Sequence, residues 1–103
     1  MKLHKFQRST NGFDYYFEKT LEPNEEIVLK MPSVSPNKRG VNDIGWQTDG
    51  DAILYATLSY KPDSDSAIWT KIEDYDDINK TISYIKIVNG DGVCRVAIRA
   101  LLN

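Results

Sequence analysis

Few residues of this chain are able to do chemistry at neutral pH. The only histidine is His4 and the only cysteine is Cys94. A Ser-His-Asp or Cys-His arrangement would have to use His4, which lies close to the N-terminus. Cys94 stands on the apolar face of a predicted strand, whereas a reactive thiol needs partly exposed, electropositive surroundings. We therefore predict a protein that is not an enzyme, without a structural zinc site and with a buried, inert Cys94.

Carboxylates gather in segments that are rich in turn-forming residues. Calcium takes six to eight oxygen ligands, so two such segments would have to come together to bind it. Solvated side chains are the preferred interpretation, and we predict no metal and no cofactor. The three groups are Asp49 with Asp51, Asp63 with Asp65, and Glu73 with Asp74, Asp76 and Asp77.

Aromatic side chains offer one further chemistry, which is a flat platform on which a sugar ring stacks. Aromatic residues also supply much of the core of a small β domain, so packing is the preferred interpretation. A carbohydrate- or small-ligand-binding β-sandwich module is kept as the alternative function. The candidates for the platform are Trp46, Trp69, Tyr55, Tyr60, Tyr75 and Tyr84.

Size and charge limit the remaining classes. The 103 residues correspond to a single domain over 1–103, and the 41% hydrophobic content is that of a globular protein. The formal charge is -2, with 13 basic against 15 acidic residues, and the basic residues are scattered. A nucleic-acid surface needs clustered positive charge. No apolar run suggests a secretory signal or a membrane span. We expect synthesis in the cytoplasm, no nucleic-acid partner and no membrane partner.

Alternation of apolar and polar residues is the strongest local signal, and it indicates strands. In the run 93–102, for example, Cys94, Val96 and Ile98 share one face while Arg95 and Arg99 lie on the other. About seven or eight short strands with frequent turns predict an all-β antiparallel β-sandwich, with a small closed β-barrel as the alternative. A short helix is allowed at 73–80. The predicted strands are 3–8, 14–18, 26–31, 43–48, 52–60, 68–73, 81–88 and 93–102.

Asp-Gly at 49–50 and Asn-Gly at 89–90 are dipeptides that favour tight type I′ hairpins. The turn at 89–90 predicts a hairpin in which Ile85 lies opposite Cys94. A register shifted by one turn position would oppose two basic residues, and both registers leave the same side chains on the apolar face. The buried core predicted from this hairpin consists of Ile85, Ile87, Val96 and Ile98.

The N-terminal segment carries more large apolar side chains than a strand near a terminus requires. Consecutive strand residues face opposite sides, so large apolar side chains lie on both faces of the run 15–17 and each face must pack against other residues. We predict an interface with a larger protein assembly or with a second copy of the chain. The alternative is that these residues close the sandwich. The predicted interface residues are Leu3, Phe6, Phe13, Tyr15, Tyr16 and Phe17.

The C-terminal part of the chain, from about residue 44, has a recognisable order of features. It contains Trp46 before the turn Asp49-Gly50, a strand at 54–58, a loop that ends in Trp69, and the run 78–81 leading into the strand 84–89. This order resembles small β-sandwich proteins encoded in the structural gene clusters of phages and prophages. The resemblance implies a virion accessory role, such as capsid decoration, cement or head completion, without chemistry. The implied partners are capsid or head-tail proteins, and the implied location is the virion.

Overall fold

The computed structural model describes residues 3–8, 14–31, 41–72 and 82–102, and in these ranges the chain forms strands and connections without any helix. The described residues therefore contain no helix that is long and apolar enough to cross a membrane. Their nine strands are β1 (Leu3–Lys5), β2 (Gln7–Arg8), β3 (Asp14–Leu21), β4 (Glu26–Lys30), β5 (Val41–Thr48), β6 (Ile53–Thr57), β7 (Thr70–Ile72), β8 (Tyr84–Val88) and β9 (Cys94–Leu102).

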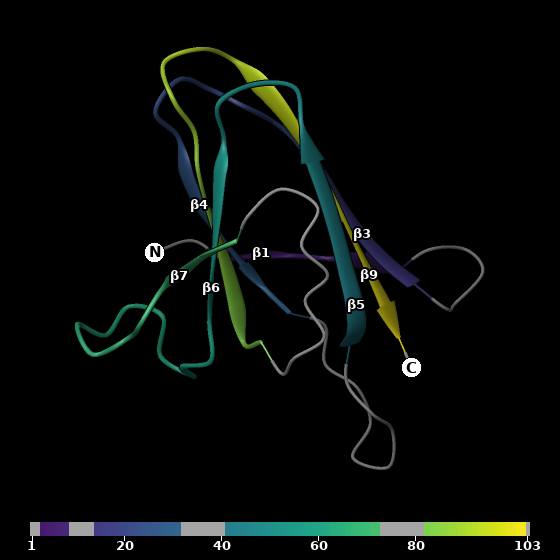
Figure 1. Ribbon diagram of the computed structural model, residues 1–103, viewed down its shortest axis with the longest axis vertical. Coiled ribbons are helices and arrows are strands. Elements are labelled where there is room, and N and C mark those ends of the chain that lie inside the picture. The colour runs from purple at the N-terminus through teal and green to yellow at the C-terminus, as the bar shows by residue number, and fades with distance from the viewer. Residues whose placement is uncertain (1–2, 9–13, 32–40, 73–81, 103) are drawn as a thin grey trace.

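The strands form two sheets that pack face to face (Figure 1). The five-stranded sheet has the order β1-β4-β8-β6-β7, and the four-stranded sheet has the order β2-β3-β9-β5. Both sheets are open, which confirms the predicted all-β sandwich rather than the closed barrel. Within the described ranges every strand pair is antiparallel except β1 with β4, which is parallel.

The parallel pair arises because the predicted strand 3–8 divides between the sheets. Its first half is β1, which lies beside β4 in the five-stranded sheet. Its second half is β2, which pairs with Tyr15 and Tyr16 of β3 in the four-stranded sheet. Phe6, between the two halves, packs against the core. The N-terminal segment therefore spans one side of the sandwich instead of adding a single strand to one sheet.

The core is built from the inward-facing residues of both sheets, as the alternation in the sequence requires. Ile85 and Ile87 of β8 are fully buried, and Val96 and Ile98 of β9 are each 2% exposed, which confirms the predicted core. The remaining core positions come from every long strand of the two sheets. They include Phe17, Leu21, Ile27, Leu29, Ile44, Trp46, Leu54 and Ile72.

The two predicted hairpins are wrong. β8 belongs to the five-stranded sheet and β9 to the four-stranded sheet, so the turn at 89–90 carries the chain across the core. The turn at 49–50 does the same between β5 and β6. The physical reason lies in Asn89, whose buried side chain binds carbonyl groups of the β3–β4 connection instead of supporting a two-residue turn. The same alternate residues are buried whether the two strands form a hairpin or lie in different sheets. The predicted core is therefore correct although the predicted hairpin is not.

Three connections that carry the chain from one sheet to the other meet at one end of the sandwich (Figure 1). Asn24, at a φ of 60°, donates its backbone N–H to the carbonyl oxygen of Gly90 at 2.7 Å. Gly50 lies so close to Cys94 that a Cβ on Gly50 would stand 2.5 Å from the Cys94 Cβ. This contact requires glycine at position 50. The connections that meet here are residues 22–25, 49–52 and 89–93.

The strand predicted over 52–60 ends at Thr57, and the one predicted over 68–73 is reduced to β7. The residues between them, 58–69, form one long connection, called here the β6–β7 loop (Figure 1). The allowed helix at 73–80 falls outside the described residues.

Candidate functional site

The two residues with the most reactive side chains are both used in packing. The ring of His4 lies edge-on against Phe17, with ring centroids 6.0 Å apart. Cys94 is buried, as predicted, and its thiol donates to the Asn89 Oδ1 at 3.0 Å. The Thr48 hydroxyl lies 3.8 Å from the same sulfur. These contacts hold the start of β9 against the crossovers and provide a structural role for the thiol.

The acidic residues within the described ranges make different contacts. Asp49 binds Arg95, Asp51 lies against Gly90, and the pair at 63 and 65 is exposed in the β6–β7 loop. The third group, Glu73, Asp74, Asp76 and Asp77, lies outside the described residues. Among the residues that are described, no three His, Cys, Asp or Glu side chains gather in a way that would hold a metal ion.

The aromatic residues do not share one platform. Trp46 is buried in the core. The Nζ of Lys86 lies 4.6 Å from the ring centroid of Trp69 and 5.4 Å from that of Tyr55. The contact with Trp69 joins the end of the β6–β7 loop to β8, whereas the contact with Tyr55 lies between the neighbouring strands β6 and β8. Tyr60 is exposed, and Tyr75 lies outside the described residues.

The residues predicted as an N-terminal interface divide between core and surface. Phe17 is in the core, and Phe6 and Tyr15 pack against it. Leu3 and Tyr16 are exposed, and Tyr16 donates its hydroxyl to the Gln7 Oε1 at 2.9 Å. Phe13 lies outside the described residues. Phe6, Tyr15 and Phe17 thus help to close the sandwich, and the N-terminal interface stays a prediction.

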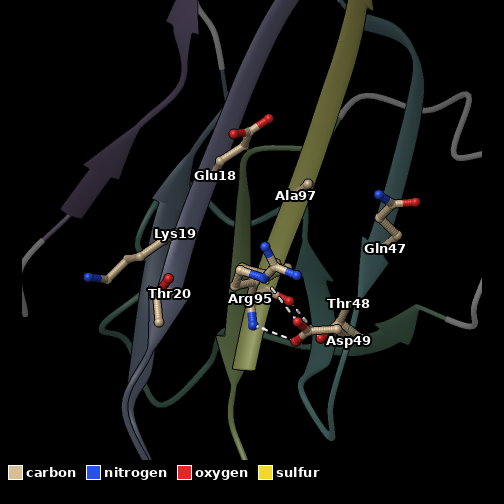
Figure 2. Close-up of a pocket in the computed structure, with 9 residues that line it drawn as sticks. Glu18, Lys19, Thr20, Gln47, Thr48, Asp49, Arg95 and Ala97 are labelled. Carbon is tan, nitrogen blue, oxygen red and sulfur yellow. Dashed lines mark hydrogen bonds and ion pairs between the residues drawn. The ribbon is translucent and has the colours of Figure 1, made fainter. Parts of the chain in front are cut away.

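A shallow polar groove of about 580 Å³ lies on the outer face of the four-stranded sheet (Figure 2). The small side chain of Ala97, on the central strand β9, forms its floor, with Glu18 on β3 and Gln47 on β5 at its sides. Asp49 and Arg95 close one end. The groove is lined by hydrogen-bond donors and acceptors, and its charged side chains include both acidic and basic groups.

Asp49 and Arg95 form a polar contact with two hydrogen bonds at the end of this groove. The backbone N–H of Arg95 donates to the Asp49 Oδ1 at 2.7 Å, and its Nε donates to Oδ2 at 3.0 Å. These two donors lower the pKa of the Asp49 carboxyl, the backbone bond more than the side-chain bond. The Nε bond joins the exposed guanidinium of Arg95 to Asp49 beside the groove (Figure 2).

Among the described residues, the three large apolar side chains with the greatest exposure lie in the β6–β7 loop. Leu58 is 66% exposed, Tyr60 85% and Ile68 79%. In Figure 1 the loop extends away from the two sheets. Exposed apolar side chains that gather into one patch are typical of a protein interface, and these three residues lie within eleven positions of one another on the same loop. Sequence reasoning missed it because the alternation of 52–60 predicts that Leu58 and Tyr60 continue a strand.

Serine hydroxyls brace the β6–β7 loop. The Ser83 hydroxyl donates to the carbonyl of Leu58 at 3.0 Å, and the Ser59 hydroxyl accepts the backbone N–H of Lys61 at 3.1 Å. Further along, Ser64 accepts the backbone N–H of Ser66 at 3.1 Å. The loop therefore has an internal framework of its own, although it lacks regular secondary structure.

Comparison of the chain with protein-family models, with curated proteins and with solved structures finds no match. The class of the protein is accordingly set by its fold, which is a β-sandwich of two open sheets.

Proposed function

We propose that this chain is a non-enzymatic structural protein that docks onto a large protein assembly through the β6–β7 loop. The observation that carries the proposal is the exposure of Leu58, Tyr60 and Ile68 on one braced loop. The assembly suggested by the resemblance of residues 44–103 is a phage particle, on which the chain would act as a decoration, cement or head-completion protein.

The energetics of the loop favour binding. Complete burial of one large apolar side chain contributes about 1.5–3 kcal/mol. Ordering a flexible loop on binding costs free energy, and the serine bonds of this loop reduce that cost because they order it beforehand. A few buried aromatic and aliphatic side chains carry most of the energy of a typical interface. Tyr60, the most exposed of the three, is the expected anchor.

The test uses particles of the phage that encodes the chain, sedimented through a density gradient. The wild-type chain should travel with the particles, and the variant Tyr60→Ser with Ile68→Ser should stay at the top. Ile53→Ser is the matched control, because Ile53 is an exposed apolar residue of strand β6 outside the loop. A double variant that sediments with the particles as well as the wild type does would refute docking through the loop.

The polar groove supports a second candidate, a small-ligand-binding module. Glu18, Gln47 and Arg95 present a carboxylate, an amide and a guanidinium around one depression, which suits a polyhydroxylated ligand. Titration of the chain with a panel of oligosaccharides, followed by amide chemical shifts, tests this candidate. Shifts that centre on Ala97 would support it, and an unchanged spectrum across the panel would count against it.

A further inference from the structure

The outer edge of β3 is only partly covered. β3 has eight residues, yet β2 pairs with Tyr15 and Tyr16 alone. Within the described part of the chain no strand pairs with this edge from Phe17 to Leu21. A strand edge left without a partner is a template for another strand.

The hydrogen-bond pattern shows which backbone groups face the open edge. The N–H of Asp49 donates to the carbonyl of Arg95, so Arg95, Ala97 and every second residue of β9 point their backbone groups toward β5. The intervening residues of β9 therefore point toward β3, where they bind the residues opposite them. It follows that Glu18 and Thr20 turn their N–H and C=O groups outward. No described residue accepts from or donates to these groups.

The side chains along this edge alternate in charge and direction. Lys19 points away from β9 in Figure 2 and forms an ion pair with Glu25, at 3.8 Å between Nζ and Oε2. Glu18 and Thr20 are exposed on the opposite face. Phe6, with its ring centroid 6.5 Å from that of Phe17, limits the open stretch at one end.

Two copies of this chain would pair poorly at the edge. Two-fold symmetry would bring the β3 strands together antiparallel, with Glu18 or Thr20 facing the outward groups of the other copy. In one register Glu18 of one copy lies opposite Glu18 of the other, and in the next register the two Lys19 residues lie opposite each other. In the third register Glu18 of each copy lies opposite Glu22 of the other. Like charges directly opposite one another destabilise a strand pair.

We propose that this edge accepts an extended segment of a partner protein by strand addition, and that the segment carries an acidic residue opposite Lys19 and a basic residue opposite Glu18. Antiparallel pairing supplies main-chain bonds to Glu18 and Thr20, and the two complementary charges set the register. The proposal is independent of docking through the β6–β7 loop, because the two surfaces lie on different sheets.

The probe is the synthetic peptide Ser-Val-Thr-Glu-Lys-Ser, titrated to millimolar concentration against the isotope-labelled chain. The expected result is a shift of the Glu18 and Thr20 amide signals, with smaller shifts at Lys19, whose amide already bonds to β9. The peptide with Glu and Lys exchanged should bind more weakly. Lys19→Gln should weaken binding of the first peptide by about 1.5- to 5-fold, the effect of one cross-strand charge pair. Lys30→Gln, on a strand whose edge β1 covers, is the matched control and should change nothing.

Three results would overturn the proposal. Amide shifts that are absent at Glu18 and Thr20 would show that the edge does not accept a strand, and shifts confined to 58–69 would point to the β6–β7 loop instead. Equal binding of the two peptides would remove the charge-based register. Concentration-dependent shifts of the same two amides without peptide would identify a second copy as the occupant.

Discussion

Replacement of Asn89 should be among the most destabilising single changes in this protein. The residue is only 4% exposed, and its amide group joins crossovers that are far apart in sequence. Its Nδ2 donates to the carbonyl oxygens of Glu22 and Gly92, both at 2.8 Å, and of Leu21 at 3.4 Å. Its Oδ1 accepts the backbone N–H of Gly90 at 2.9 Å and the Cys94 thiol.

The size of the effect follows from the bonds lost. Each buried group left without its partner costs about 1–3 kcal/mol, and Asn89→Ala removes two short bonds to carbonyl oxygens. A loss of about 2–5 kcal/mol is therefore expected, which is a large part of the 5–15 kcal/mol typical of a small domain. Asn89→Asp keeps the shape but directs a carboxylate at carbonyl oxygens, so the pKa of the introduced carboxyl is raised on folding. Stability of this variant is then retained at low pH and lost as the pH rises above about 4.

Urea unfolding followed by circular dichroism measures both variants, with the pH varied for Asn89→Asp. Gln47→Ala, which removes an exposed amide side chain from β5, serves as the comparison and should change the unfolding free energy by less than about 0.5 kcal/mol. A loss below about 1 kcal/mol for Asn89→Ala, or a stability of Asn89→Asp that increases with pH, would refute the account of this residue as the link between the crossovers.

Further predictions concern single contacts. Because the pKa of Asp49 is lowered in the folded state, the contribution of its carboxylate to the unfolding free energy is present above about pH 4 and is lost as the pH falls. Asp49→Asn should therefore weaken the fall of stability below about pH 4. A fall as steep as that of the wild type would contradict the role of Arg95. Lys86→Met should cost about 0.5–1 kcal/mol and change the fluorescence of Trp69, whereas an unaltered spectrum would argue against the cation–π contact. Val96→Ala should lower the unfolding free energy by about 1–4 kcal/mol in urea titrations, and a smaller loss would mean that the core relaxes around the cavity.

Much of the fold is predictable from the sequence because the side-chain period of a strand is local information. Cys94, Val96 and Ile98 alternate with two arginines, and the structure places each on the expected face. The choice between hairpin and crossover at 89–90 is different, because it depends on where the Asn89 amide finds its acceptors. Those acceptors lie on residues 21 and 22, far away in the sequence, and no local pattern identifies them.

The candidate sites were harder to predict for the same reason. Leu58 and Tyr60 continue an alternating pattern, yet they are exposed because the strand stops at Thr57 and the chain turns into the β6–β7 loop. The open edge of β3 depends on the point at which the N-terminal segment leaves one sheet for the other. Composition does not encode that point, and Phe6 marks it only once its place in the core is known.

Docking through the β6–β7 loop can be examined by amide hydrogen exchange, with the chain measured free and bound to the proposed larger assembly. We expect residues 58–69 to exchange more slowly in the bound chain than in the free chain, with exchange in the polar groove around Ala97 unchanged. Slower exchange elsewhere, with 58–69 exchanging at the rate of the free chain, would contradict it.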